Sequence, residues 1–346
     1  MRYVSLEMVE PGDQLGKSIF SNDGRALLNQ GVQLTVGMIN QLRRVGVTML
    51  YIQDERFEDI KLEDMVAEET RRETLTSMGE VVQCVQQGQD FNANRIMEQV
   101  RKIIDQIVVN KKFLMDIHDI RTVDNHLFLH SLNVCMMSLL IGAHLQLSQH
   151  QLEELAIGAL FHDLGKLIVE ESEEERKVSM TNTQDHTWKG FNILKKKHEL
   201  SLLSAHVALQ HHEFLDGSGY PRGLSGDEIH EFARIVAVTN LYDNLISPFD
   251  GERPYAPYEA AEILMGYAEK KLDYEIVWQF LRSVAIYPTG SSLKLSNGKV
   301  GVVVDQHLGL PARPVVRIIS SSEDEEVEIE EIDLSKQTTI MIEKML

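Results

Sequence analysis

The chain has 346 residues, 43% of them hydrophobic and 25% charged, which is typical of a globular protein with two or three domains. Its net charge of -19 argues against nonspecific binding to nucleic acid, which needs a basic surface. No apolar run approaches the ~20 residues of a membrane span, and the first residues have no signal-peptide core. The two cysteines, Cys84 and Cys135, form no disulfide framework. We therefore expect a cytoplasmic protein that binds no nucleic acid and spans no membrane.

Residues 1–58 are predicted to form a small α/β module. A hairpin-turn signal lies at Asn22-Asp23-Gly24. Thr35 can cap a helix that runs to about Val45, and residues 47–52 have the composition of a strand.

Residues 59–112 are charged and helix-prone, with a break at residues 88–92 that predicts two helices. We interpret them as a helical connector that packs on the next domain. A dimerising coiled coil, which would make the chain a homodimer, is the alternative. It is less favoured because no heptad pattern persists.

Residues 113–286 are mostly helical by period and contain the histidine motifs described below. After residues 287–290 the composition changes, and short alternating runs over 291–340 predict a small β unit. The acidic run at 323–326 is interpreted as a solvated turn. The predicted fold is mainly α: a helical bundle at 113–286, the α/β module at 1–58, the connector at 59–112 and a C-terminal β unit at 287–346.

The histidines are concentrated in the middle of the chain. Residues 1–117 contain none, and eleven of the thirteen lie between His118 and His212. Several polar side chains continue helix stripes that are otherwise apolar: Asp163 after Leu152, Leu155, Ala156, Ala159 and Leu160; His130 with Val134, Met137 and Ile141; and His212 with Ala205, Ala208 and Leu209.

A carboxylate on a buried stripe is costly unless it is paired or binds a metal. A lone histidine on an apolar face is more often a hydrogen-bonded core residue. The repetition of the pattern favours a metal centre instead, because one centre satisfies all of these groups together. Imidazoles with a few carboxylates and no grouped cysteines favour iron or manganese in a binuclear arrangement, and the sequence does not choose between the two metals.

The motifs resemble those of the HD-GYP family of metal-dependent phosphodiesterases, over about residues 115–286. The segment His162-Asp163-Leu164-Gly165-Lys166 matches the HDxGK motif of the family, and His130 lies in its first histidine motif. His186, followed by Gly190, matches the intermediate histidine. The remaining matches are His211-His212-Glu213 with Asp216-Gly217-Ser218-Gly219-Tyr220-Pro221, which is the signature, and Arg253-Pro254-Tyr255 downstream.

This resemblance implies a helical bundle that hydrolyses cyclic di-GMP to pGpG or GMP. It implies two divalent metal ions, iron or manganese, with Asp163 bridging them, and these ligands: His130, His162, Asp163, His186, His211 and His212. Lys166, expected one helical turn beyond His162, would neutralise charge on the phosphate, and Arg253 would be a second phosphate contact. Tyr220 belongs to a loop that would shape the pocket entrance, contact substrate and dock a GGDEF-type cyclase.

Some positions depart from the family pattern. Asn240 stands where the family has an aspartate ligand; its amide oxygen can coordinate a metal but is neutral, so metal affinity should fall. Asp243 is expected to be structural. His126 stands where some members have a glutamate ligand for a third metal, and it could ligate in that place. Ala256 follows the Arg253 motif where a basic residue is usual.

Three functions remain open from the sequence. The first is an active cyclic-dinucleotide phosphodiesterase, favoured by the intact ligands and loop. The second is a binding or scaffold module with weak or no hydrolysis, favoured by Asn240, Ala256 and His126. The third is an HD hydrolase of another nucleotide or phosphoester.

Overall fold

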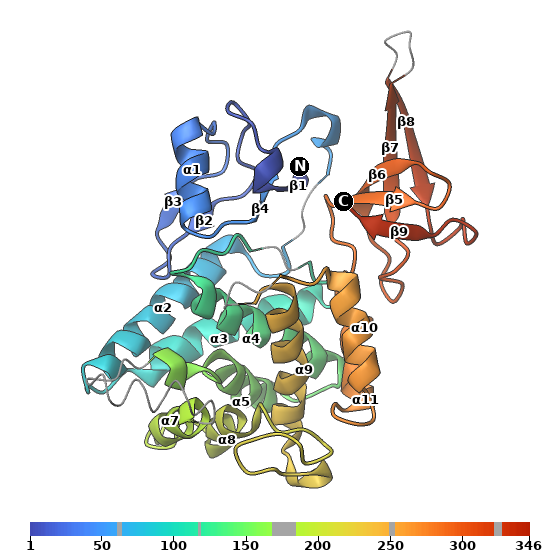
Figure 1. Ribbon diagram of the computed structural model, residues 1–346. Helices are drawn as coiled ribbons and strands as arrows, with labels where there is room; N and C mark the ends of the chain where they lie inside the picture. The colour runs from blue at the N-terminus through green and yellow to red at the C-terminus, as the bar shows by residue number, and fades with distance from the viewer. Residues whose placement is uncertain (61–63, 117–118, 168–184, 249–252, 322–326) are drawn as a thin grey trace.

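The computed structural model describes residues 1–60, 64–116, 119–167, 185–248, 253–321 and 327–346. A helical bundle forms the body of the molecule, with the N-terminal module and a C-terminal sheet side by side at one end of it (Figure 1). This arrangement confirms the predicted mainly α fold. The acidic run at 323–326 lies outside the described residues.

The N-terminal module consists of two short antiparallel strand pairs and one helix. Strand β1 (Arg2–Ser5) pairs with β4 (Met49–Ile52), and β2 (Ile19–Phe20) pairs with β3 (Ala26–Leu28) across the predicted turn. Helix α1 (Val36–Arg44) begins after Thr35, whose side chain accepts a hydrogen bond from the amide of Met38. The 3-10 turns η1 (Leu6–Met8) and η2 (Glu55–Phe57) complete the module, which has its own apolar core.

Two helices follow, α2 (Glu68–Gln86) and α3 (Ala93–Asn110), separated at the predicted break. Their apolar faces pack on each other and on α4 (His126–His144), and they share one continuous core with the later helices. The division between connector and bundle at residue 112 stays a prediction.

Helix α4 lies at the centre of the bundle and packs against α2, α3, α5, α9 and α11. By length and composition it could cross a membrane, but 94% of its apolar window is buried inside the protein. A helix that is apolar on all sides is suited to such a central position. The surrounding helices are α5 (Gln149–Leu160), α7 (Asp185–Leu194), α8 (Leu202–Gln210), α9 (Glu231–Ile246), α10 (Pro257–Tyr267) and α11 (Tyr274–Leu281).

The C-terminal unit is a five-stranded antiparallel sheet with the order β8-β7-β6-β5-β9. Its strands are β5 (Ser292–Leu295), β6 (Val300–Asp305), β7 (Val315–Ser321), β8 (Val327–Asp333) and β9 (Ile342–Met345). The sequence patterns did not predict β1 or β9.

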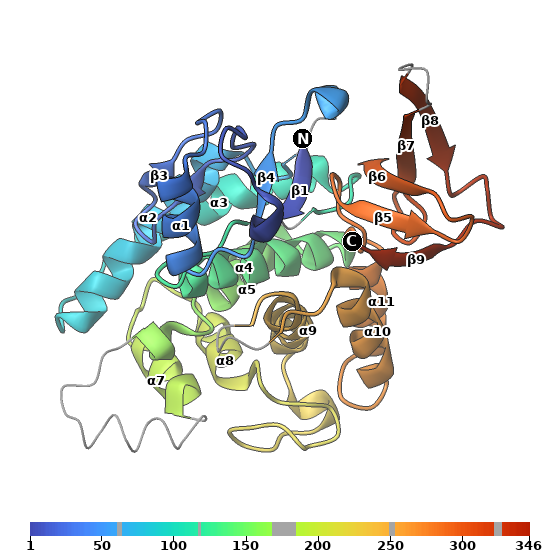
Figure 2. The ribbon, with the colours of Figure 1, turned by 45° about the horizontal axis from the view of Figure 1, so that its top comes forward.

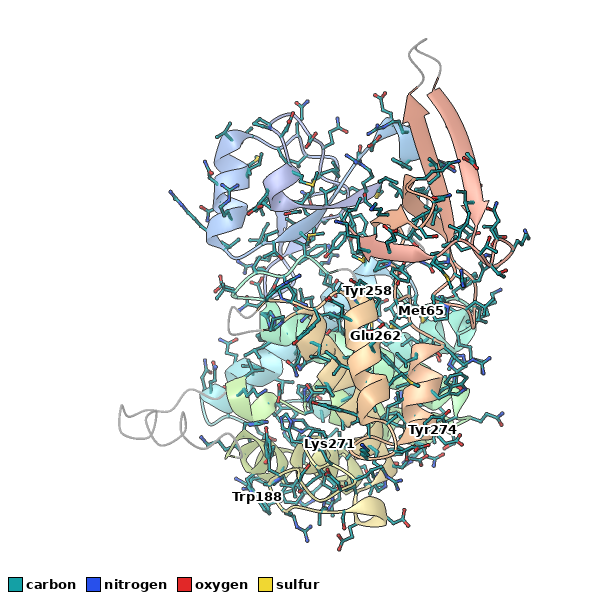
Figure 3. The ribbon with its side chains drawn as sticks, turned by 45° about the vertical axis from the view of Figure 1, so that its right-hand side comes forward. Met65, Trp188, Tyr258, Glu262, Lys271 and Tyr274 are labelled. Carbon is teal, nitrogen blue, oxygen red and sulfur yellow. The ribbon has the colours of Figure 1, made fainter. Side chains whose placement is uncertain are left out.

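The C-terminal unit contacts both other parts of the molecule, and Figure 2 shows it beside β1 and β4 of the module. The amide of Tyr3 donates to the carbonyl of Gly290 (3.0 Å). Tyr258, on α10 below the sheet (Figure 3), stacks against Tyr287 with ring centroids 5.6 Å apart.

Candidate metal centre

Two histidines occupy equivalent positions just beyond the ends of α5 and α8. His162 Nδ1 lies 2.8 Å from the carbonyl oxygen of Ala159, and His211 Nδ1 lies 2.9 Å from that of Ala208. The last carbonyls of a helix have no partner within the helix, so each imidazole satisfies one of them. A carbonyl only accepts, so Nδ1 carries the proton in both rings, and each Nε2 keeps a lone pair for a metal.

The expectation that helical stripes continue into these motifs was wrong. Helix α5 ends at Leu160 and α8 at Gln210, so His162, Asp163 and His212 lie in turns. Lys166 lies in a separate 3-10 turn, η3 (Leu164–Leu167), rather than one turn further along the same α-helix. A continuous helix would direct consecutive side chains to different faces. The turns instead let these side chains converge on one point.

His130 enters from α4 and meets His162. Its Nδ1 lies 2.6 Å from Oδ2 of Asp243, and its Nε2 lies 3.2 Å from Nε2 of His162. The carboxylate and the Ala159 carbonyl hold the ring protons on Nδ1, so both Nε2 atoms present lone pairs to each other. Two facing lone pairs repel one another, and a cation that both nitrogens bind removes the repulsion.

The two oxygens of Asp163 face two different sets of histidines. Oδ2 lies 3.6 Å from His130 Nε2 and 3.5 Å from His162 Nε2. Oδ1 lies 3.4 Å from His186 Nε2 and 3.4 Å from His211 Nε2. We call His130, His162 and Asp163 the His130 group, and Asp163 with His186, His211 and His212 the His186 group.

Both groups fit metal ions. Two ligand atoms on one ion, each bonded at about 2.1 Å, lie about 3–3.5 Å apart, which matches the separations around Asp163. Within each group the ligand atoms lie within 4.8 Å of one another. Nε2 of His212 is buried without a hydrogen-bond partner among the described residues. Such a buried polar atom is costly unless something else binds it.

The protonation states suit metal binding. Burial lowers the pKa of His211 to about 3 and lowers the pKa of His212 well below its ordinary value, so both rings are neutral at pH 7. Burial alone would raise the pKa of Asp163, but His162 and Lys166 outweigh it and hold that pKa well below the usual range. Neutral imidazole and ionised carboxylate are the forms that bind metals.

Gly165 of the HDxGK motif permits the close approach of His186. A Cβ atom built on Gly165 would lie 2.0 Å from the carbonyl oxygen of His186 and 2.7 Å from its carbonyl carbon. No side chain fits that space, and backbone atoms cannot yield as a flexible side chain can. The glycine therefore allows the start of α7 to lie against the turn that carries Asp163.

The Gly-Tyr-Pro loop folds back onto the centre. A Cβ on Gly219 would lie 2.4 Å from the carbonyl oxygen of His212, which itself accepts the amide proton of Tyr220 (3.1 Å). The Tyr220 ring stacks on His212 with centroids 4.5 Å apart. Buried Glu213 accepts the amides of Arg222 (2.8 Å) and Leu224 (2.9 Å). The loop is therefore more than a local turn, because it covers one histidine of the centre.

The start of this loop region is also tethered to the α10–α11 turn. The amide of Leu215 donates to the carbonyl of Lys271 (2.9 Å), and the Lys271 ammonium lies over the ring of Phe214. Lys271 lies at the end of the bundle away from the C-terminal sheet (Figure 3).

The other predicted site residues lie outside the two groups. Lys166 pairs with Oδ2 of Asp163 (2.7 Å). Asn240 is buried on α9, and its Oδ1 accepts from Nδ2 of Asn244 (2.8 Å). His126, at the start of α4, has its Nε2 2.9 Å from the carbonyl oxygen of Ser247, and its role with a third metal stays a prediction.

Arg253 is exposed and precedes α10.

Sequence reasoning missed Arg121, whose guanidinium binds both oxygens of Asp243 at 2.8 and 2.6 Å. Burial alone would raise the pKa of Asp243, but Arg121 and the His130 bond hold it well below the usual value. Asp243 thus contacts Arg121 and His130 inside the bundle, and its expected structural role stays a prediction. The two residues are 122 positions apart, so no local pattern signals their contact.

Comparisons with known proteins identify the family of the chain. Residues 102–276 match the family model described as an HD domain, and residues 293–346 match a KOW domain associated with HD domains. The chain is 29% identical over 243 residues to a cyclic di-GMP phosphodiesterase of Pseudomonas aeruginosa, covering 68% of this chain and 58% of that protein. It is 36% identical over 131 residues to a 3'3'-cGAMP-specific phosphodiesterase of Vibrio cholerae, covering 36% of this chain and 27% of that one.

A solved structure described as an HDG"Y"P protein from Bdellovibrio bacteriovorus aligns with a TM-score of 0.49 and 16% identity, over 80% of this chain and 97% of that one.

The chain belongs to the HD domain family. Its resemblance to the HD-GYP proteins, predicted from the motifs, is confirmed. The chain spans 58% and 52% of the length of the Pseudomonas aeruginosa relative and of a second cyclic di-GMP phosphodiesterase, from Borreliella burgdorferi.

Proposed function

We propose that this protein is a metal-dependent phosphodiesterase that hydrolyses cyclic di-GMP to pGpG or GMP and so controls the level of that second messenger. One observation carries the proposal: the two oxygens of a single buried carboxylate, Asp163, face two separate histidine sets. A carboxylate shared in this way can hold two metal ions close together, the arrangement that two-metal phosphoesterases use. The relatives described above, which are phosphodiesterases of cyclic di-GMP and of 3'3'-cGAMP, support a cyclic dinucleotide as the substrate class.

The proposed ligands divide by group. His130 and His162 would hold one ion, His186, His211 and His212 the other, and Asp163 both. Imidazole and carboxylate without thiolate suit iron or manganese. Two such ions would polarise a phosphodiester and lower the pKa of a water molecule to near neutrality.

The chain's own residues would bind and orient the substrate. The side chain of Lys166 is 36% exposed, so its ammonium can reach a phosphate while it stays beside Asp163. There it would offset the negative charge that develops on the phosphoryl oxygens. Tyr220 and Arg253 are the proposed further substrate contacts. The Gly-Tyr-Pro loop is the proposed docking surface for a GGDEF-type cyclase, and a cytoplasmic location accords with the two free cysteines.

A second function, a binding module with weak or no hydrolysis, is favoured by Asn240. Its amide lies on the inner face of α9 and already accepts a hydrogen bond from Asn244. A neutral amide where an aspartate would supply negative charge leaves the cations less well compensated. Both functions require nucleotide binding, and only the phosphodiesterase turns the nucleotide over.

One experiment separates these functions. Protein purified anaerobically is analysed for metal content, and cyclic di-GMP turnover is followed by chromatography. About two iron or manganese ions per chain with a linear or mononucleotide product support the enzyme. Low turnover after metal loading, with nucleotide still bound, supports the binding module.

Two variants test the location of the site. His162→Ala combined with Asp163→Ala should abolish metal binding. The matched control is His150→Ala, because the His150 side chain is 79% exposed on α5. Full metal content in the double variant would refute the proposed centre.

A further inference from the structure

Residues 119–125, which lead into α4, join three parts of the molecule. Asp119 pairs with Arg71 of α2. Ile120, the next residue, is buried in the apolar core of the N-terminal module. Arg121 extends to Asp243 of α9. Three consecutive side chains thus engage α2, the module and the inner bundle.

The same segment also donates hydrogen bonds to the N-terminal module. The amide of Val123 donates to the carbonyl of Val45 (2.9 Å), and Nδ2 of Asn125 donates to the carbonyl of Phe20 (2.6 Å). Asn125 immediately precedes α4, the helix that presents His130. The module therefore fixes the path of the chain up to the start of that helix.

Arg121 sets the orientation of the carboxylate that holds His130. Its two nitrogens bind one oxygen each, which fixes the plane of the Asp243 carboxylate. In that plane Oδ2 lies 2.6 Å from His130 Nδ1. The Asp243 side chain is fully buried and that of Arg121 is 9% exposed, so water does not replace either partner. Without Arg121 the carboxylate would be buried with a single partner and free to turn.

We propose that Arg121 and Asp243 are positioning residues for the His130 group. We also propose that the N-terminal module, through residues 119–125, holds Arg121 in the place from which it orients Asp243 toward His130. This inference rests on the proposed metal centre. It gives the module a specific effect, because a shift of residues 119–125 alters metal binding at the His130 group and leaves the His186 group unchanged. Loss of a partner that orients a metal ligand typically lowers affinity by about 10–100-fold.

The test is Mn²⁺ binding to the full chain with no nucleotide present, measured by equilibrium dialysis and electron paramagnetic resonance. Arg121→Gln should keep one Mn²⁺ at wild-type affinity and weaken the other by about 10–100-fold. The exchange-coupled signal of two neighbouring ions should give way to that of an isolated ion. Arg101→Gln is the matched control, since Arg101 binds both oxygens of Glu153 between α3 and α5, and neither residue belongs to the His130 or the His186 group.

A second variant tests the link to the module while Arg121 stays in place. Ile120→Ala removes the side chain inserted in the module core, and we expect it to weaken the same Mn²⁺ site by a smaller factor. It also keeps the test decisive if Arg121→Gln does not fold.

Two Mn²⁺ ions at wild-type affinity in either folded variant would overturn the inference and leave the proposed function intact. A wild-type chain that binds no Mn²⁺ would refute the metal centre itself, and the inference with it.

Discussion

The two halves of the centre share Asp163 but are held in different ways. The His130 group depends on charged side chains from distant parts of the chain: Arg121 holds Asp243, which holds His130. The His186 group depends on close backbone approach, at Gly165 against His186 and at Gly219 against His212. One half is therefore sensitive to charge and to the N-terminal module, whereas the other is sensitive to the volume of single residues.

This difference shows why a metal site can be recognised from local motifs and still depend on residues outside them. The glycines of the His186 group belong to the motifs themselves, and each lies against the backbone of another motif residue, His186 for Gly165 and His212 for Gly219. The charged support of the His130 group comes from α9, through Asp243, and from Arg121 in the segment before α4, neither of which lies in a histidine motif. A variant can therefore damage one half selectively.

The largest loss of metal affinity is expected from substitution of Asp163, which both halves share. Asp163→Asn should weaken both metals by more than about 100-fold, beyond the cost typical of outer-shell partners, because the neutral amide offers one weak ligand oxygen in place of two charged ones. Mn²⁺ dialysis measures both sites, and Asp227→Asn, at a fully exposed side chain, is the control. Wild-type affinity at either group would show that the carboxylate is not shared.

Gly165→Ala should damage the His186 group alone. The added methyl would meet the His186 carbonyl at 2.0 Å, so the start of α7 must move away from Asp163. We expect loss of one of two bound metal ions, measured by metal analysis. In the control, Gly79→Ala, the new methyl has no atom within 4 Å and lies within α2, so stability should rise by about 0.5–1 kcal/mol with both metals kept. Two tightly bound ions in Gly165→Ala would contradict the packing argument.

Asn240→Asp should raise metal occupancy and any hydrolysis, with affinity rising at least about 10-fold, because it restores a negative charge on the inner face of α9. Asn244→Asp places the same charge one turn further along the helix and controls for a general electrostatic effect. If Asn240→Asp lowers both metal content and turnover, the site depends on the neutral amide of Asn240, and the argument that the amide weakens metal binding is wrong.

The smallest expected effect is the change of folding stability with pH, in protein from which a chelator has removed the metal ions. The pKa of His211 is lowered from 6.5 to about 3 in the folded protein. Below pH 6.5, His211 is therefore protonated in the unfolded chain but stays neutral in the folded one. Stability should therefore decrease as pH falls from 7.5 to 5.5, by up to about 1.4 kcal/mol per pH unit for this residue. Urea unfolding measures the slope, and His211→Asn should make it shallower. An equal slope in both proteins would show that His211 titrates normally in the fold.

The sequence patterns predicted the helical bundle, the module and the C-terminal sheet, because long apolar periods and turn residues are local signals. They also singled out six residues that the structure brings together in the two groups. They failed where the contact was distant, as between Arg121 and Asp243, and where a helix ended before its apolar stripe did, as at Leu160. Strands β1 and β9 were missed, although β4 and β5 are equally short, because polar side chains interrupt both β1 (Arg2–Ser5) and β9 (Ile342–Met345) and leave no apolar run.

The central position of α4 has a consequence for the chain as it is being made. Helix α4 ends at His144, but α9, which covers it, is complete only at Ile246, about 100 residues later. Because synthesis adds about 5–20 residues per second, α4 stays without α9 packed on it for on the order of 5–20 seconds. His130 and Asn133, both buried on α4, make it a poor substrate for insertion into a bilayer, where polar side chains are costly. The histidine proposed to bind metal in the finished protein thus also raises the cost of placing α4 in a bilayer.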